Sequence, residues 1–176
     1  MTYVYLSDGT KVSAQISGGA GLKYRGAFVY DVTSSGTETL NSVAWDEGRL
    51  DYSASQTSPK DEWFVQDHLG NVRSVVNLSA TTASAAVLEQ NDYLPFGTRA
   101  STPTLNTSNR YRYAGKENQK VGSVDLALLD FGARYYDPYV CSWTSVDPMA
   151  EKYLSSSPYN YCNVDPINRF DPDGKD

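Results

Sequence analysis

The feature that most constrains this chain is the recurrence of short turn signals, because it leaves no room for long helices. Between residues 1 and 99, β-prone runs alternate with turns about every 8 to 20 residues, the spacing of an antiparallel β-meander. The pair Asp8-Gly9 separates the run 1–6 from the run 11–16. Such a pair is a strong hairpin signal, since glycine adopts positive φ at little cost. We therefore predict a mainly β fold of antiparallel hairpins.

The same reasoning predicts most of the remaining strands of this half. The clearest hairpin has arms at 62–67 and 72–76, joined at His68-Leu69-Gly70-Asn71. Further strands are expected at 22–33, 39–45, 50–52 and 88–94, and a loop or weak helix at 80–86. Tyrosine dominates the aromatic residues, with 14 Tyr against 5 Phe and 3 Trp. Because a tyrosine ring packs while its hydroxyl needs a polar partner, we expect half-buried sheets with wet edges rather than one compact oily core.

The last third of the chain differs in character. Residues 100–109 carry little to bury and are predicted to form a surface loop that separates a sheet at 1–99 from a closing segment at 110–176. Prolines at 138, 148, 158, 166 and 172 exclude a long helix or a central strand there. Short strands are expected at 126–129 and 133–136, and one short helix at 149–154, capped by Asp147.

Charge and hydrophobicity argue against two classes of partner. The formal net charge is −6, so phosphate backbones would be repelled, and the densest basic stretch, 109–113, holds only two arginines. No apolar run approaches the ~20 residues that span a bilayer. The N-terminus lacks the basic start and apolar stretch of a signal peptide. We therefore expect no nucleic-acid binding, no membrane insertion and no targeting signal within this sequence.

Several short words of the sequence resemble the Rhs/YD-repeat family. Asp67-His68-Leu69-Gly70-Asn71-Val72-Arg73 is similar to its DxxGNxR element, and the other matching words are Tyr93-Leu94-Pro95-Phe96-Gly97, Tyr113-Ala114-Gly115-Lys116-Glu117, Leu129 to Pro138, Trp143 to Pro148, Ser157 to Cys162 and Asp171-Pro172-Asp173-Gly174. Residues 62–174 carry the match, in the order expected for the RHS-repeat-associated core domain of polymorphic-toxin-like proteins. Residues 1–61 look like the degenerate repeats that precede it.

The resemblance implies a fold and a role. In this family YD-repeat hairpins join into one strip of sheet that spirals into a hollow shell, and the core domain closes one end. A variable C-terminal effector, often a toxin, is held inside a secreted or cell-surface protein. In some members an aspartate-dependent self-cleavage frees that effector just after the DPxG word. This chain departs from the family at Cys141-Ser142, where Gly-Arg is usual, and it ends two residues after Gly174.

Self-cleavage of this kind needs two carboxylates that share a proton. The candidates near the tail are Asp137, Asp147, Asp165, Asp171 and Asp173. By resemblance to the terminal motif we single out Asp147 with Asp171 as the catalytic pair and Arg134 as the orienting charge. The alternative is that aspartates before prolines shape turns and caps, and that Arg134 forms an ordinary salt bridge. The missing arginine near residue 142 weakens the expectation of protease activity.

Other site chemistries find little support. The single histidine, His68, stands at a predicted turn without a nucleophile elbow, and one His with two separated Cys is a poor zinc site. No calcium loop, P-loop or dinucleotide glycine pattern occurs, so no cofactor or metal is expected. Cys141 and Cys162 are read as two small buried hydrophobes rather than a disulfide.

Three hypotheses for function follow. The first is a structural shell that encapsulates or presents a C-terminal effector, with that effector or other segments of the parent protein as partners. The second is a self-processing aspartate-dependent domain built on Asp147 and Asp171. The third is a surface adhesion or glycan-binding module that uses exposed aromatics such as Trp63. Exposed sheet edges would favour self-association in all of these cases.

Overall fold

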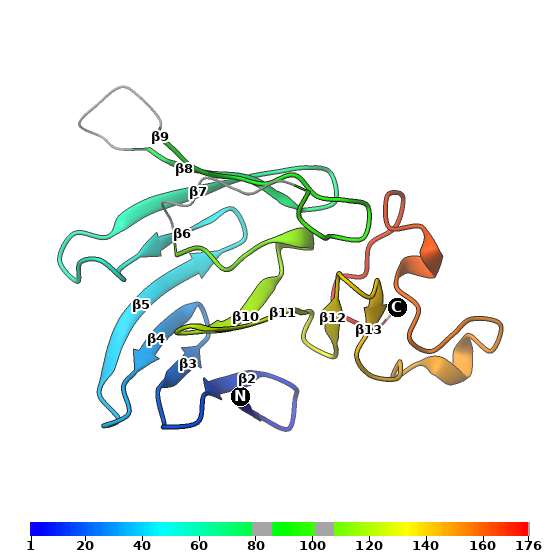
Figure 1. Ribbon diagram of the computed structural model, residues 1–176, viewed down its shortest axis with the longest axis horizontal. Coiled ribbons are helices and arrows are strands. Elements are labelled where there is room, and N and C mark those ends of the chain that lie inside the picture. The colour runs from blue at the N-terminus through cyan, green and yellow to red at the C-terminus, as the bar shows by residue number, and fades with distance from the viewer. Residues whose placement is uncertain (79–85, 101–107, 176) are drawn as a thin grey trace.

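A computed structural model describes residues 1–78, 86–100 and 108–175, and in these the strands form a nine-stranded and a four-stranded sheet (Figure 1). The large sheet is antiparallel throughout, and its strands lie in the order of the sequence, from β1 to β9. Its strands are β1 Thr2–Tyr5, β2 Lys11–Gln15, β3 Gly21–Arg25, β4 Phe28–Val32, β5 Glu38–Trp45, β6 Gly48–Asp51, β7 Lys60–Gln66, β8 Val72–Asn77 and β9 Ala86–Gln90. The predicted mainly β, antiparallel hairpin fold is thus confirmed.

The geometry of the turn between β7 and β8 explains why its sequence motif contains aspartate, glycine and asparagine. The Oδ1 atom of Asp67 accepts hydrogen bonds from the backbone N–H groups of Leu69 and Asn71, at 3.0 and 3.1 Å. Gly70 takes a φ of +77°, a left-handed conformation that L side chains resist. Asn71 donates from Nδ2 to the second carboxylate oxygen of Asp67, at 2.9 Å. One aspartate therefore closes the loop, and one glycine turns it.

Some predicted strands differ from the observed ones. The single strand expected at 22–33 is wrong, since β3 and β4 pair with each other around Gly26, which has a φ of +61°. The strand expected at 88–94 ends at Gln90 in β9, and Tyr93 makes only an isolated bridge to Arg99. The loop or helix expected at 80–86 lies almost entirely outside the described residues, although Ala86 begins β9.

The first two strands of the small sheet lie within the curve of the large sheet, and the last two lie nearer the C-terminus (Figure 1). It consists of β10 Glu117–Val121, β11 Val124–Asp130, β12 Tyr135–Asp137 and β13 Ser142–Trp143. The predicted strands at 126–129 and 133–136 correspond to β11 and β12, whereas β10 and β13 were not predicted. Most of the loop expected at 100–109 lies outside the described residues, but Asn109 at its end is buried.

Polar contacts join the two sheets. The Nζ atom of Lys11 lies 2.8 Å from carboxylate oxygens of both Glu117 and Asp130, and the Nε atom of Arg110 lies 3.3 Å from Glu117. Buried Glu89 in β9 pairs with Arg112. The inner face of the large sheet is therefore held to the segment that follows it by buried charges as well as by apolar packing.

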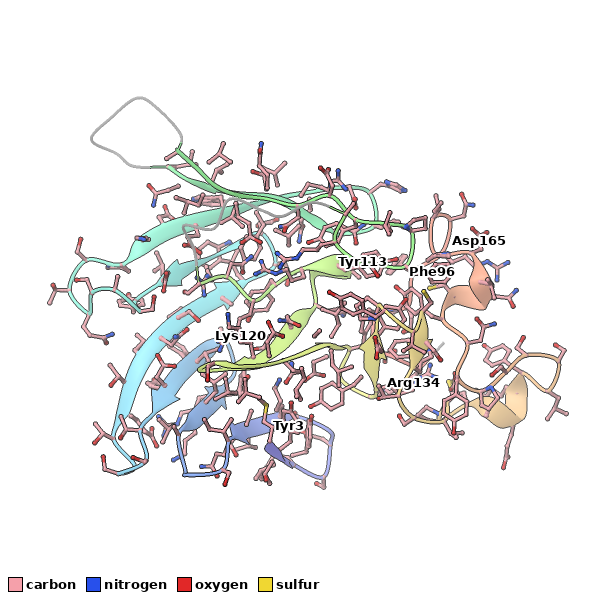
Figure 2. All side chains as sticks on the ribbon, viewed as in Figure 1. Tyr3, Phe96, Tyr113, Lys120, Arg134 and Asp165 are labelled. Carbon is pink, nitrogen blue, oxygen red and sulfur yellow. The ribbon has the colours of Figure 1, made fainter. Side chains whose placement is uncertain are left out.

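An aromatic core holds the closing segment together. Its buried members are Tyr113, Leu129, Phe131, Tyr136, Trp143, Tyr161 and Cys162, and Phe96 packs against them (Figure 2). The hydroxyls of Tyr113 and Tyr136 donate to the backbone carbonyls of Pro95 and Phe96, at 2.8 and 2.9 Å. The expectation of half-buried tyrosines is wrong for this core, because bonds to backbone carbonyls satisfy the hydroxyls in full burial.

The rest of the tail is irregular. The predicted helix at 149–154 is one 3-10 turn, η2 Ala150–Lys152, and the other described helical elements are the 3-10 turns η1 Tyr113–Gly115 and η3 Cys162–Val164. Both cysteines are free thiols; Cys162 is buried as predicted, but Cys141 is exposed. None of the helices in the described parts of the chain is long and apolar enough to cross a membrane.

Candidate functional site

The three residues singled out from the sequence are brought together at the end of the molecule. Arg134 follows a turn at Gly132 and directly precedes β12. Asp147 precedes Pro148 and the turn η2, and Asp171 precedes Pro172 in the last turn of the described chain. Packing of the aromatic core places these distant segments side by side.

Arg134 is the centre of the arrangement. Its Nη2 atom lies 2.9 Å from Oδ2 of Asp147 and 3.5 Å from Oδ2 of Asp171. The guanidinium also stacks on the ring of Trp143, with Cζ 4.2 Å from the ring centroid. Arg134 and Asp171 each have a side chain that is 1% exposed, and that of Asp147 is 9% exposed. One buried cation thus binds two carboxylates.

Asp171 also organises the terminal turn. Its Oδ1 atom accepts hydrogen bonds from the backbone N–H groups of Asp173, Gly174 and Lys175, at 3.1, 2.6 and 3.3 Å. Arg134 Nε donates to the carbonyl oxygen of Gly174, at 2.6 Å. Gly174 has a φ of +79°, and a Cβ there would lie 3.1 Å from the backbone nitrogen of Arg134. The backbone of the Asp171–Gly174 turn therefore curves around the guanidinium of Arg134.

Asp147 fixes the turn that follows it. Its Oδ1 atom accepts a hydrogen bond from the N–H of Met149, at 2.6 Å, which is the capping role expected of an aspartate before proline. Its own N–H donates to the carbonyl of Pro158, at 3.0 Å, and that carbonyl also accepts a bond from Arg134 Nη1, at 3.3 Å. Asp147 therefore both caps a turn and forms an ion pair with Arg134.

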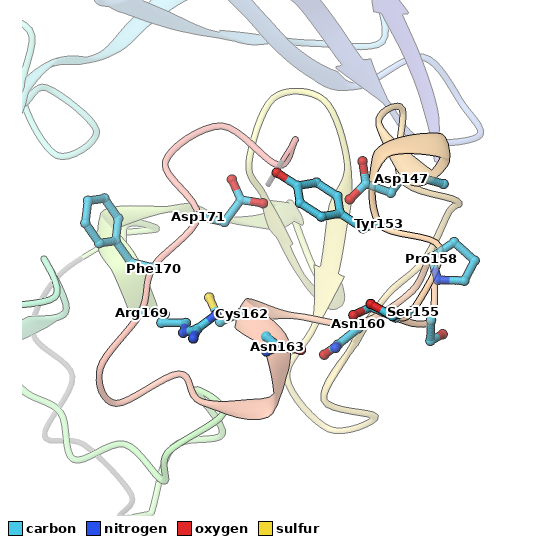
Figure 3. Close-up of a pocket in the computed structure, with 13 residues that line it drawn as sticks. Asp147, Tyr153, Ser155, Pro158, Asn160, Cys162, Asn163, Arg169, Phe170 and Asp171 are labelled. Atoms are coloured by element: carbon cyan, nitrogen blue, oxygen red, sulfur yellow. The ribbon is translucent and has the colours of Figure 1, made fainter.

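A pocket of about 390 Å³ opens beside this cluster. Asp147, Tyr153 and Asp171 lie along one side of it, opposite Cys162 and Asn163 (Figure 3). The site therefore offers two carboxylates at the wall of a space large enough for a peptide segment or several waters.

Burial changes the pKa of two groups at this site, Arg134 and Cys162. Burial lowers the pKa of Arg134, while the charges of Asp147 and Asp171 raise it and oppose that loss. Arginine remains a cation at neutral pH in proteins, so Arg134 keeps its positive charge beside the two aspartates. Burial raises the pKa of Cys162 to about 11, which keeps its thiol protonated and unreactive at neutral pH.

The other sequence candidates have local roles in turns. Oδ1 of Asp137 accepts from the N–H groups of Tyr139 and Val140, Asp165 accepts from Nδ2 of Asn168, and Asp173 pairs with Lys175. His68 is exposed at its predicted turn. Within the described ranges, no group of three or more His, Cys, Asp or Glu side chains is placed to hold a metal ion.

Some features of the site were not predicted from the sequence. Tyr153 and Arg169 line the pocket, but neither belongs to a sequence motif that indicates a place in a site. The bond between Arg134 Nε and the Gly174 carbonyl was also missed. The left-handed φ of Gly174 is the one feature with a local signal, because an Asp-Gly pair is typical of such turns.

The fold is shared with chains in solved structures of TcdB2-TccC3. The crystal structure of TcdB2-TccC3-Cdc42 matches 98% of this chain and 9% of that chain, with a TM-score of 0.75 and 20% identity. TcdB2-TccC3 without its hypervariable C-terminal region matches the same shares, with a TM-score of 0.73 and 19% identity. At this identity the similarity shows the shared mainly β fold.

Curated relatives are similar in sequence over parts of their length. Salivary gland surface protein 1 of Aedes aegypti is 33% identical over 113 residues, 62% of this chain and 3% of the relative. The tRNA3(Ser)-specific nuclease WapA of Bacillus spizizenii is 26% identical over 98% of this chain and 7% of its own length. Toxin subunit YenC2 of Yersinia entomophaga is 32% identical over 92 residues, 50% of this chain and 9% of the subunit.

The chain thus spans less than a tenth of the length of each of these proteins. No family model matches it. The sequence similarity to toxin subunit YenC2 supports the resemblance to Rhs-type toxin proteins, and the solved structures add the shared fold. Assignment to the RHS-repeat-associated core domain stays a prediction.

Proposed function

We propose that this chain is a wall segment of an Rhs-type shell that encloses a downstream polypeptide of the same protein. The observation that carries the proposal is that the curved sheet β1–β9 already wraps the segment that follows it in sequence. Largely buried pairs such as Lys11–Glu117 and Arg112–Glu89 line this contact. A sheet that surrounds one stretch of its own chain has the geometry that an enclosing wall requires.

The sheet is also suited to extension. Among the described strands, β1 and β9 are the two outermost of the large sheet, and each pairs with one neighbour. A free strand edge offers unpaired N–H and C=O groups to a further strand. The proposed wall would continue from these edges in a longer protein, which we place outside the cell or at its surface by analogy with the toxin relatives.

Limited proteolysis tests the enclosing role. A small folded reporter is joined after residue 176 within the full reading frame, and its digestion is compared with that of the free reporter. We expect the joined reporter to be cleaved much more slowly, because the wall shields it. Equal cleavage of the two forms, with the wall itself intact, would reject enclosure.

A second candidate function, self-cleavage after the terminal turn, is favoured by a specific observation. Asp147 and Asp171 meet at one guanidinium, and the same guanidinium donates to the carbonyl of Gly174. In this role Asp147 is the better base, since Oδ1 of Asp171 is occupied by three backbone N–H groups. Arg134 would stabilise negative charge that develops on the Gly174 carbonyl oxygen.

Extension of the chain past residue 176 tests this second candidate. Fragments that end near Gly174, lost in Asp147→Asn and retained in Asp173→Asn, are the expected result. Asp173 is the matched control because its half-exposed carboxylate pairs with Lys175 outside the Arg134 cluster. An uncleaved wild-type fusion would rule out self-cleavage while leaving the wall proposal in place.

A further inference from the structure

A second cavity lies away from the Arg134 cluster, on the inner face of the large sheet. Its volume is about 430 Å³, within the range of small-ligand sites. Its walls come from β3, β4, β5 and β7 on one side and from residues 111–117 on the other. Small residues among the lining, such as Ala44 and Gly115, leave the space open.

Aromatic rings form much of this cavity. Phe64 and Tyr111 contact each other with ring centroids 5.8 Å apart, and Tyr24, whose ring centroid already lies 4.5 Å from Nζ of Lys11, lines the cavity beside them. All three side chains are half-buried, and neither Phe64 nor Tyr111 belongs to a buried core cluster. Two rings outside both cores, turned toward a cavity, are available to a ligand.

Charges of both signs border this cavity. Asp46 lines the cavity and is exposed, and no other described side chain pairs with its carboxylate. Glu117 is already paired with Lys11 and Arg110. Lys116 also lines the cavity, but its Nζ atom donates to the carbonyl of Pro172 and lies 5.1 Å from the ring centroid of Phe131.

We infer that this cavity binds an ammonium group carried on an apolar stem. Cations are attracted to the faces of aromatic rings, and a nearby carboxylate adds to that attraction. An anionic ligand would be repelled by Asp46, and a purely apolar ligand would cover that carboxylate without replacing its water. A lysine side chain and a free alkylammonium compound share the required chemistry. The inference does not depend on the enclosing role.

Proton NMR titration of the full chain tests this inference with three probes. Choline represents a free quaternary ammonium, Nα-acetyl-lysine amide represents a lysine side chain, and 3,3-dimethylbutanol is the neutral isostere of choline. We expect upfield shifts of the probe protons nearest the nitrogen, because they lie over ring faces. Binding of choline alone assigns the site to free ammonium compounds, and binding of the lysine probe assigns it to polypeptide.

Two variants and one control localise the effect. Asp46→Asn should weaken binding about fivefold, the size of a partly exposed charge contact. Phe64→Leu should reduce the upfield shift, since Tyr24 and Tyr111 remain in the cavity, while the sheet still folds. Glu47→Gln removes the same charge one residue away, from a side chain outside the cavity, and should leave binding unchanged. Equal binding of the neutral isostere, no binding of either cation, or equal loss in Glu47→Gln would overturn the inference.

Discussion

The side-chain oxygen Oδ1 of Asn71 accepts a hydrogen bond from the backbone N–H of Ala114, at 2.7 Å. Asn71 belongs to the turn of β7 and β8, and Ala114 belongs to the segment that the large sheet surrounds. Ala114 has a φ of +51°, so this contact holds a residue in an unfavourable backbone conformation. This hydrogen bond thus connects two sequence motifs whose contacting residues are 43 positions apart.

A second contact between two sequence motifs predicts that one substitution will strongly lower stability. Gly97 has a φ of +92°, and a Cβ there would lie 2.7 Å from the ring of Tyr113. Gly97→Ala should therefore lower the free energy of unfolding by about 3 kcal/mol, through overpacking and backbone strain together. Chemical denaturation measures the change. Gly9→Ala is the matched control, because Gly9 has a similar φ of +86° with open space around it, and it should cost about 1 kcal/mol.

The Arg134 cluster predicts a large effect from one buried cation. Arg134→Met keeps much of the side-chain volume but leaves Asp147 and Asp171 without their shared partner. Loss of one partner from a buried ion pair destabilises a protein by about 3 to 5 kcal/mol. Thermal and chemical denaturation should both show it. Arg25→Met removes an exposed pair with Glu38 and should change stability little; equal effects of the two variants would contradict a buried, structural Arg134.

The contact between the sheets predicts a loss of stability in acid. Although burial opposes it, the charges of Arg110 and Lys11 hold the pKa of Glu117 below its ordinary value. A carboxylate with a lowered pKa contributes stability above its unfolded pKa of about 4.3, and this is lost as the pH falls through the folded value. Denaturation curves between neutral pH and pH 3 should show this decline, and Glu117→Gln should flatten it. A decline of the same slope in Glu117→Gln would assign the acid sensitivity elsewhere.

The left-handed backbone conformation of Cys141 predicts a stabilising substitution. Cys141 has a φ of +59°, the left-handed region that glycine adopts most readily. Cys141→Gly should raise the free energy of unfolding by about 0.5 to 1 kcal/mol, since relief of strain exceeds the added freedom of the unfolded chain. Cys141→Ala keeps the strain and removes the thiol, so it should change little. Stabilisation by both would point to the thiol instead.

Local turn chemistry made much of the large sheet predictable. Asp8-Gly9 and the 68–71 turn lie where hairpins were expected, because their side-chain and φ requirements are local. The turn at Gly26-Ala27 was missed, since it lacks the Asn-Gly or Asp-Gly pair that marks most two-residue turns.

The residues of the site could be predicted only where they belong to a recognisable sequence motif. Asp147, Asp171 and Arg134 were chosen by resemblance, and the structure places them together. The pair Lys11–Glu117 spans 106 residues and follows no local pattern, so only the packing of the two sheets reveals it. The aromatic pair of Phe64 and Tyr111 is hidden for the same reason.

Electron cryo-microscopy of the full-length protein that contains this chain tests the wall most directly. We predict density in which β1 and β9 each pair with a further strand, so that strands β1 to β9 form part of a continuous curved sheet around an enclosed polypeptide. A map in which both edges face solvent and this region forms a separate module with no enclosed chain would contradict it.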